Sequence, residues 1–274
     1  MNKSLVTTRQ PSIVSFNNAG MANRIKNIVS CIRLSDNVQV KWKPELHAAY
    51  GLTDTKLTDY FVGLDETDDI EGKEVRKTWK FALLEEDNIP MFLVRESEYA
   101  YQYLTGEKLG APSPDGRGID LVYDRIPEKV RQEYLKCFDK LEVSPEILEI
   151  VDSIETEHFD GDVVSVHIRS WKDSPYRRNA FFDLNSYRLL MDEYGKDKKF
   201  YVSADDPAVV NTLINHYGTE RILSINNSTH KLSCMIDMLL LSKNDVIIGS
   251  PYSSFTEVAW WFSKCKSEVV LSWK

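Results

Sequence analysis

The chain has 274 residues, 42% of them hydrophobic and 28% charged, with a formal net charge of −8 at pH 7. This composition predicts a soluble globular protein of one large domain or two of ordinary size. The negative charge argues against a general nucleic-acid-binding protein, which would normally be basic. The N-terminus lacks a signal-peptide pattern, and the apolar runs fall short of the roughly 20 residues of a membrane helix. We therefore expect a cytoplasmic protein without a transmembrane segment.

The four cysteines are far apart in the sequence and have no metal-ligand spacing. They are Cys31, Cys137, Cys234 and Cys265. Three of them lie in predicted helices, which favours buried free thiols over a metal site. Free thiols suit the reducing environment of the cytoplasm.

The first 42 residues predict a βαβ unit. Two short strands, 12–16 and 38–42, flank a helix over Met21–Asp36 in which apolar residues recur at helical spacing. Asn23 and Arg24 lie in the first turn of this helix. Because a helix N-terminus attracts anions, both side chains could face a ligand. The glycine-rich phosphate-loop patterns do not occur anywhere in the chain.

The middle of the chain has weaker patterns. Residues 89–94 predict a strand, 105–118 a loop rich in glycine and proline, and 128–141 an amphipathic helix. Residues 145–154 predict a further helix, because proline is favoured at its first position. We place a domain boundary after it, which gives an N-terminal domain of residues 1–155 and a C-terminal domain of residues 156–274.

From Val163 onward, predicted strands and helices alternate regularly. The strands are Val163–Ile168, Lys199–Ser203, Arg221–Ile225, Val246–Gly249 and Glu268–Leu271. The helices are Leu184–Tyr194, Ala208–Tyr217, Leu232–Ser242 and Phe255–Ser263. This alternation predicts a parallel, doubly wound α/β sheet.

The strand that begins at Val163 is apolar and ends in His167 and Arg169, with further arginines in the polar run 170–178 that follows. In an open α/β sheet, ligands bind outside the carboxyl ends of the strands. These residues are therefore placed to hold an anion such as a phosphate. The alternative is a core strand that leads into an ordinary charged surface loop.

Two other predicted strand ends also carry polar groups. Asp205 and Asp206 could hold Mg²⁺ on a substrate phosphate, or one of them could cap the helix that begins near Pro207. Ser253 and Ser254, with Ser250 before them, precede a helix, where they could bind phosphate or serve as a plain N-cap. Capping and binding are compatible in both places.

Asp237 lies in a predicted helix whose other positions are mostly apolar. Its carboxylate could be half-buried and paired with an arginine. Alternatively it could accept hydrogen bonds from the two adjacent N–H donors of guanine.

Three segments resemble motifs of fucosyltransferases that use GDP-fucose, the α1,6-fucosyltransferase and nodulation-factor group. HIRSWKD is similar to their histidine–arginine motif, YVSADDP to their Asp-Asp motif, and IDMLLLSKNDVIIGSPYSSFTEVAWWF to their third motif. Order and spacing agree, apart from an extra residue before Ser253. GMANRIKNIVS also resembles a turn near the start of the protein O-fucosyltransferases.

This resemblance implies a GT-B-like α/β fold, in which two Rossmann-like domains with parallel sheets face a central cleft. It implies that the donor binds to the C-terminal domain and that transfer inverts the anomeric carbon without a metal or other cofactor. The implied catalytic residues are Arg169, at the diphosphate, and Asn23, across the cleft. The implied donor-binding residues are His167 and Asp237 at the guanine, Asp205 or Asp206 at the nucleoside, and Ser253, Ser254 and Arg169 at the phosphates. Arg24, also counted among them, would lie with Asn23 across the cleft, near the diphosphate or the acceptor.

The sequence departs from the motif at Ser170, where a second arginine is usual. Arg177 or Arg178 could supply that charge. The chemistry agrees with the resemblance, because a guanidinium aimed at the leaving diphosphate stabilises the transition state more than the ground state. A general base for the acceptor hydroxyl is also expected. Glu45, Asp173 and Glu193 are open alternatives for it.

We therefore expect a fucosyltransferase that moves fucose from GDP-fucose to a hydroxyl of an oligosaccharide or glycan, as in polysaccharide biosynthesis. One alternative is a transferase of the same fold that uses another nucleotide sugar, and a second is a non-catalytic nucleotide-binding protein. A third is a metal-dependent phosphohydrolase built on His167, Asp205, Asp206 and His216.

Overall fold

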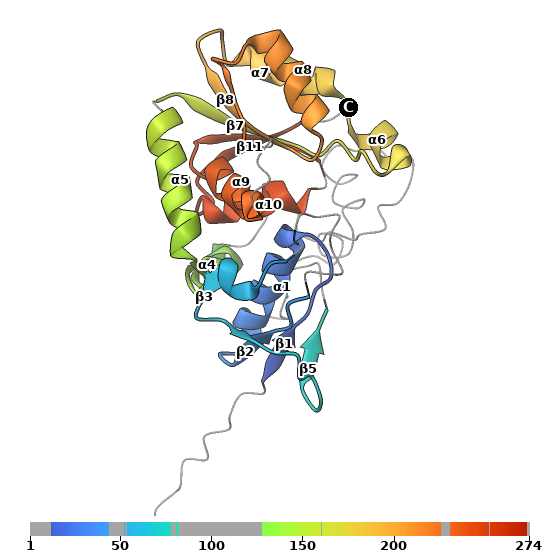
Figure 1. The fold of residues 1–274 in the computed structure, drawn as a ribbon, viewed down its shortest axis with the longest axis vertical. Helices are drawn as coiled ribbons and strands as arrows, with labels where there is room; N and C mark the ends of the chain where they lie inside the picture. The colour runs from blue at the N-terminus through green and yellow to red at the C-terminus, as the bar shows by residue number, and fades with distance from the viewer. Residues whose placement is uncertain are drawn as a thin grey trace, which may run out of the picture.

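The computed structural model of the protein describes residues 12–43, 52, 54–77, 81, 128–159, 161–225, 231–251 and 253–272. Two parallel sheets lie at opposite ends of the molecule, with helices packed between them (Figure 1). The strand predicted over 89–94 and the loop predicted over 105–118 lie outside the described residues. None of the described helices is both long enough and apolar enough to cross a membrane.

The first sheet has the strand order β4-β2-β1-β5, and all its pairings are parallel. Its strands are β1 (Ile13–Ser15), β2 (Val38–Val40), β4 (Asp65–Glu66) and β5 (Glu74–Arg76). Helix α1 (Met21–Leu34) connects β1 to β2, so the predicted βαβ unit is confirmed. Sequence patterning predicts neither β4 nor β5, because their few, mostly charged residues show no strand alternation.

The second sheet has the order β11-β10-β7-β8-β9, again with parallel pairings. Its strands are β7 (Val163–Ile168), β8 (Lys199–Ala204), β9 (Ile222–Leu223), β10 (Val246–Gly249) and β11 (Glu268–Leu271). Central β7 is buried along its whole length, as expected for an apolar strand covered on both faces. The predicted parallel α/β sheet is therefore confirmed, with differences only at the ends of elements.

Helices cover both faces of the second sheet. The outer face packs against α7 (Leu184–Glu193) and α8 (Pro207–Tyr217), and the inner face against α9 (Ser233–Leu241) and α10 (Ser254–Phe262). Alternate residues of β7 therefore belong to different cores. Val164, Val166 and Ile168 belong to the outer core, whereas Val163 belongs to the inner one.

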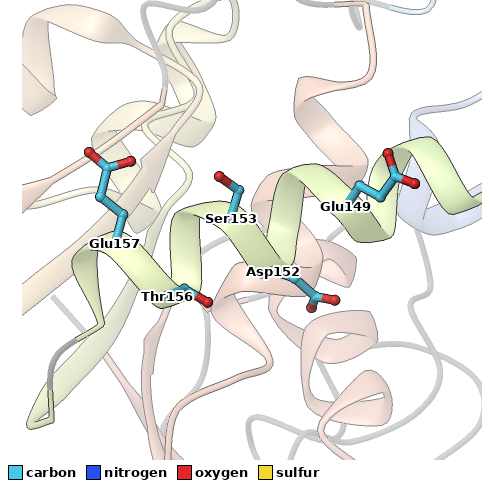
Figure 2. Close-up of a pocket in the computed structure, with 5 residues that line it drawn as sticks. All are labelled: Glu149, Asp152, Ser153, Thr156 and Glu157. Atoms are coloured by element: carbon cyan, nitrogen blue, oxygen red, sulfur yellow. The ribbon is translucent and has the colours of Figure 1, made fainter.

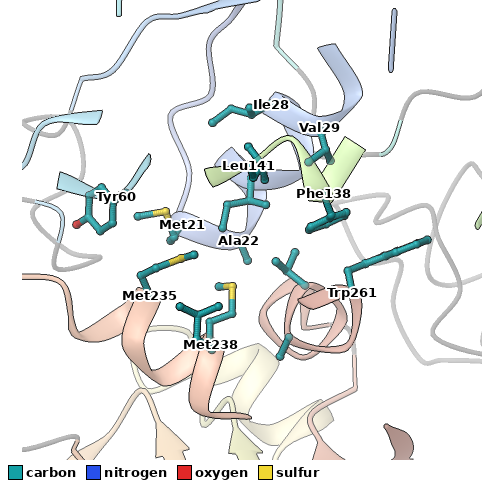
Figure 3. Close-up of a cluster of buried hydrophobic side chains, with 14 of the residues drawn as sticks. Met21, Ala22, Ile28, Val29, Tyr60, Phe138, Leu141, Met235, Met238 and Trp261 are labelled. Carbon is teal, nitrogen blue, oxygen red and sulfur yellow. The ribbon is translucent and has the colours of Figure 1, made fainter. Parts of the chain in front are cut away.

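The inner core is shared between the two sheets. Helix α1 packs against α10 and α4 (Glu128–Asp139), and α5 (Pro145–His158) packs against α9. Figure 3 shows side chains of α1 and α4 meeting those of α9 and α10, among them Met21, Ala22, Phe138, Met235, Met238 and Trp261. One continuous apolar cluster thus joins the N-terminal and C-terminal parts. The predicted boundary after residue 155 falls in the last turn of α5 and stays a prediction.

Helix α1 also buries polar side chains, and two of them pair with groups on other elements. The Asn27 amide donates to Ser15 Oγ (2.8 Å) and to the carbonyl of Arg76 (3.0 Å), which ties α1 to β1 and β5. Lys26 Nζ lies 2.6 Å from Glu257 Oε2 of α10, and both side chains are almost completely buried. These contacts allow a helix with polar residues to lie inside the molecule.

Four further elements are short. Residues 170–178 are a polar run in the sequence, yet α6 (Pro175–Phe181) begins within it. No residue of α6 is buried, so the helix has no apolar periodicity that could reveal it. The others are a 3₁₀ turn, η2 (Leu57–Asp59), and an antiparallel pair of β3 (Phe61–Val62) with β6 (Glu142–Val143).

Candidate functional site

His167 lies at the carboxyl end of β7 and is held on several sides. Its Nδ1 lies 2.8 Å from Thr256 Oγ1, and its ring stacks on Phe255 with centroids 4.8 Å apart. Burial, with a smaller contribution from the charge of Arg169, lowers the pKa of His167 to about 3. The imidazole is therefore neutral at pH 7 and offers a fixed hydrogen-bonding edge rather than a positive charge.

Ser250 fixes the backbone at the end of β7. Its Oγ donates to the carbonyl of His167 (3.0 Å), accepts from the backbone N–H of Arg169 (2.6 Å) and lies 2.6 Å from the hydroxyl of Tyr187. Next to it, Gly249 leaves room for α10, because a Cβ there would lie 2.4 Å from Thr256 Cγ2. The end of β10 thus positions both His167 and Arg169.

Arg169 follows β7, and its guanidinium is oriented by Asp205 at the end of β8. Arg169 Nη1 lies 2.8 Å from Asp205 Oδ2, and the Arg169 side chain is 31% exposed. The other carboxylate oxygen of Asp205 accepts from the backbone N–H of Ser170 (2.6 Å). Asp205 therefore holds both the side chain of Arg169 and the backbone beyond it, while the guanidinium keeps a surface toward solvent.

Asp206 and Ser253 cap helices, as predicted for one of the two aspartates and for the serines. Asp206 accepts from the N–H of Ala208 (3.1 Å) at the start of α8. Ser253 accepts from the N–H of Phe255 (3.3 Å) at the start of α10, where Ser254 is the first residue. These caps place two helix N-termini beside the strand ends, where backbone N–H groups favour anions.

Trp171 has an unusual backbone and a charged environment. Its φ of 54° lies in the left-handed region, which is rare for a bulky residue, and its side chain is buried. The guanidinium carbon of Arg169 lies 5.0 Å from its ring centroid, and that of Arg177 lies 4.8 Å from it. The ring of Trp171 thus carries two guanidinium groups within cation–π distance.

Asp237 is buried against β8, and its partner differs from the arginine considered in the sequence. It accepts a short hydrogen bond from the Tyr201 hydroxyl. Burial raises its pKa to about 7, although hydrogen bonds from Tyr201 and Ser203 lower it. The alternative of a half-buried ion pair is therefore wrong, because α9 presents Asp237 to a tyrosine of the sheet. Ser203 pairs with His167 across the strands, so Asp237 and His167 lie in one neighbourhood.

Asn23 and Arg24 lie on α1, across the inner core from the second sheet. Within the described part of the chain, Asn23 Oδ1 is buried without a hydrogen-bond partner. Arg24 donates to the carbonyls of Ala19 (3.0 Å) and Lys43 (3.0 Å) and packs over the ring of Trp42. These contacts support the turn before α1 and the end of β2.

One electrostatic observation links α1 to the surroundings of Asp237. Burial raises the pKa of Cys234 to about 12, with an added increase from Asp237 and a decrease from Arg24. Both charged groups therefore act on the first turn of α9. The four cysteines are free, with Cys31 and Cys137 buried and the other two partly buried.

The structure separates the residues of the predicted phosphohydrolase. His216 lies on the exposed side of α8, where Arg188 contacts its ring, whereas His167 faces the inner helices. Among the described residues, no three His, Cys, Asp or Glu side chains are grouped to hold a metal ion. Of the general-base alternatives, Glu45 lies outside the described residues, and Asp173 and Glu193 are exposed.

A hollow occurs on the outer surface of α5, away from the strand ends (Figure 2). Among the described residues its lining comes from that helix, and none was predicted as a site residue: Glu149, Asp152, Ser153, Thr156 and Glu157. Figure 1 shows α5 on the opposite side of the second sheet from α6. The hollow is therefore separate from the candidate site at the strand ends.

Several residues of the site escape prediction from sequence. Phe255 and Thr256 reach His167 from α10, and Tyr201 reaches Asp237 from β8. Thr256 and Phe255 directly follow the predicted Ser253–Ser254 pair, so their position in the first helical turn was a usable signal. Tyr201 carries no such signal, because its partner is 36 residues away.

Comparison with known proteins gives the fold. No protein-family model and no curated sequence matches the chain. Among solved structures, the chain is similar to NodZ α-1,6-fucosyltransferase soaked with GDP-fucose, with a TM-score of 0.53 and 18% identity over 92% of each chain. Fucosyltransferase NodZ from Bradyrhizobium gives 0.51 and 19% over the same shares.

A plant enzyme is similar as well. FUT1 from Arabidopsis thaliana in complex with GDP gives a TM-score of 0.55 and 11% identity, covering 95% of this chain and 70% of that chain. At such identities the likeness establishes the fold alone. The resemblance predicted from the sequence motifs is confirmed at this level: the chain has the GT-B-like α/β fold of these fucosyltransferases.

Proposed function

We propose that the protein is a glycosyltransferase that moves fucose from GDP-fucose to a hydroxyl of a glycan, inverting the anomeric carbon. The observation that carries this proposal is Arg169, which Asp205 holds at 2.8 Å at the carboxyl end of the central strand. Ligands of open α/β sheets bind at that edge. The likeness to fucosyltransferase structures bound to GDP or soaked with GDP-fucose supports the choice of donor.

The diphosphate would be bound on one side of this edge. The exposed surface of the Arg169 guanidinium can donate two parallel hydrogen bonds to phosphate oxygens. The N-terminus of α10, capped by Ser253, adds backbone N–H groups, and Ser254 adds a hydroxyl. Charge that develops on the leaving diphosphate would then be stabilised by donors that are already oriented.

The guanine would be bound on the inner side of the edge. The neutral imidazole of His167 provides a hydrogen-bonding edge, and ionised Asp237 accepts from the two adjacent N–H groups of guanine. Because the pKa of Asp237 is about 7, this recognition should strengthen as the pH rises through neutrality. Asn23 and Arg24, and a glycan acceptor, would lie on the α1 side, across the central cleft of a two-domain arrangement.

We propose that transfer needs no metal. Asp205 binds Arg169, and Asp206 caps α8, so both carboxylates already serve the arrangement of the site. An arginine and helix N-termini can neutralise a diphosphate in the place of a cation.

The experiment combines binding and turnover. GDP, UDP, ADP and CMP are compared by thermal shift at equal concentration, and GDP-fucose hydrolysis is measured with and without EDTA. We expect GDP to give the largest shift and hydrolysis to survive EDTA. An equal shift by UDP or ADP would contradict the guanine assignment, and restoration of activity by Mg²⁺ after chelation would contradict the metal-free mechanism. GDP binding without hydrolysis or transfer would favour a non-catalytic nucleotide-binding protein.

A further inference from the structure

We propose that Arg177 of α6 is a second diphosphate-binding residue, and that the ring of Trp171 positions it together with Arg169. This inference rests on the proposed donor site and adds to it a residue from outside the sheet. It gives α6 a role: the helix carries a guanidinium to the carboxyl end of β7.

The ring of Trp171 provides the geometry. Arg169 precedes it by two residues and Arg177 follows it by six, yet both guanidinium carbons lie within 5.0 Å of its centroid. Trp171 is held in place, because its side chain is buried and its backbone carbonyl accepts from the N–H of Ser174 (2.8 Å) just before α6. The two guanidinium groups therefore share one aromatic neighbour at the end of β7, and an anion with several charges bound there could take hydrogen bonds from both.

The backbone of Trp171 agrees with a functional origin. Its φ of 54° costs energy for a residue with a large side chain, and such backbone conformations concentrate at ligand sites. This residue lies between Arg169 and the start of α6 at Pro175. Its backbone carbonyl accepts from the N–H of Ser174, which closes a turn before the helix.

The charge distribution agrees as well. Residues 169–178 contain four cationic side chains and one acidic side chain, in a protein whose net charge is −8. Arg169 is matched by Asp205 at 2.8 Å and Arg178 by Asp206 at 3.6 Å. With Asp205 and Asp206 counted, four cationic side chains still face three acidic ones, so the cluster is positive in a chain of net negative charge, as suits a diphosphate.

The residue beside Arg169 does not fill this role. Ser170 is completely buried, and its N–H donates to Asp205. Its hydroxyl is buried and, in the described part of the chain, has no hydrogen-bond partner. A second guanidinium beside Arg169 therefore comes from another element, and Arg177 of α6 lies at the same Trp171 ring.

The test measures affinity for GDP, inorganic pyrophosphate and guanosine by calorimetry in the parent protein, Arg177→Ala and Arg177→Lys. We expect Arg177→Ala to weaken GDP and pyrophosphate about 10-fold or more while guanosine binds as before, since charge-assisted contacts are lost only to the phosphates. Arg177→Lys, which keeps a charge, should lie between the two. Arg178→Ala is the matched control, because Arg178 pairs with the capping Asp206, and it should reduce GDP affinity less.

The outcomes separate this inference from the proposed function. Unchanged GDP and pyrophosphate affinity in both Arg177 variants, or an equal loss for guanosine, would overturn it. If the parent binds pyrophosphate without preferring guanine nucleotides, the donor assignment fails, yet a loss of pyrophosphate in Arg177→Ala still supports the role of Arg177. A parent protein that binds neither GDP nor pyrophosphate would overturn both. Should Arg177→Ala fail to fold, Arg177→Lys and Arg177→Gln carry the test.

Discussion

Two ion pairs of nearly equal length lie in different regions of this protein. Lys26 and Glu257 are 2.6 Å apart between α1 and α10, with side-chain exposures of 0% and 5%. Arg169 and Asp205 are 2.8 Å apart at the strand ends, with exposures of 31% and 14%. The first pair joins segments 231 residues apart and is closed to any ligand. The second keeps one partner open to solvent, which is what a binding arginine requires.

The distance between the charged groups therefore does not show what an ion pair does in this protein. Burying two charges costs several kcal/mol per ion, so the inner pair is tolerated only while both partners are present. The outer pair is partly screened by water and adds little stability, typically about 0–1 kcal/mol for exposed pairs. Its value lies in orienting a guanidinium. We therefore expect changes to the inner pair to affect folding, and changes to the outer pair to affect binding and turnover.

The largest expected effect is on the inner pair. Lys26→Met leaves Glu257 as a buried charge without its ammonium, so the free energy of unfolding should fall by about 3–5 kcal/mol. Urea unfolding measures this directly. As a control, Lys26→Met combined with Glu257→Leu should recover much of the loss, because no charge is then left uncompensated. A loss below 1 kcal/mol in the single variant would contradict the comparison.

The next effect is on the outer pair. Arg169→Lys keeps the charge but loses the planar fork, so turnover of GDP-fucose should fall about 100-fold, or about 2.7 kcal/mol in the barrier. Its melting temperature should stay close to that of the parent, since the pair is partly exposed. Lys243→Arg is the control for turnover, because it exchanges one basic residue for another in the ion pair with Glu155 of α5, away from the strand ends. A near-normal rate and donor affinity in folded Arg169→Lys would remove Arg169 from the mechanism.

A smaller effect should follow from Gly249, which lets α10 approach the strand ends. In Gly249→Ala the new methyl would meet Thr256 Cγ2 at 2.4 Å, so α10 or the Thr256 side chain has to move. We expect a loss of about 1–3 kcal/mol in unfolding free energy, as in other overpacked sites. GDP affinity should also fall, because Thr256 holds His167. Gly249→Ala with Thr256→Ser, which removes the clashing methyl, should restore stability.

The second sheet was predictable because its strands are short, apolar and separated by helices of ordinary length. All six residues of β7 are buried, as its run of mostly apolar residues predicts for a central strand. The grouping of His167, Arg169 and Asp205 was also predictable, because the carboxyl ends of parallel strands meet at one edge. The N-caps Asp206 and Ser253 were predictable from their immediate neighbours, since an aspartate before proline and a serine before a helix are start signals.

The remaining features depend on contacts between distant segments. Helix α6 has no buried residue, and its neighbour Trp171 adopts a backbone that no sequence pattern specifies. The hydrogen bond from Tyr201 to Asp237 requires α9 to pack on β8, and the closeness of Thr256 to His167 requires the missing side chain of Gly249. Sequence patterns report periodicity and local signals, so partners of this kind emerge only from the folded chain.

The effect expected to be smallest in the parent protein is a pair of opposing pH dependences at the site, which cancel there and show only in variants. Burial lowers the pKa of His167 from 6.5 to about 3, so below pH 6.5 the unfolded chain binds a proton that the folded chain refuses. Stability from this group is therefore lost as the pH falls. Burial raises the pKa of Asp237 from 3.8 to about 7, so between these values the folded chain binds the extra proton. Stability from this group is lost as the pH rises.

Because the two slopes have opposite signs between about pH 4 and 6.5, they largely cancel in the parent protein. Asp237→Asn should remove one of them, so that its stability relative to the parent falls as the pH is lowered from 6.5 toward 4.5, by at most about 1.4 kcal/mol per pH unit. His167→Gln should show the reverse, with relative stability falling as the pH rises over the same range. Urea unfolding of the three proteins at pH 4.5, 5.5, 6.5 and 7.5 measures both slopes, and differences from the parent cancel the contributions of other groups.

The same Asp237→Asn protein should lose the rise in GDP affinity over UDP that we expect in the parent between pH 6 and 8. If both variants kept the slopes of the parent, folding would not shift the pKa of His167 or of Asp237. That result would remove the electrostatic basis for placing guanine beside them.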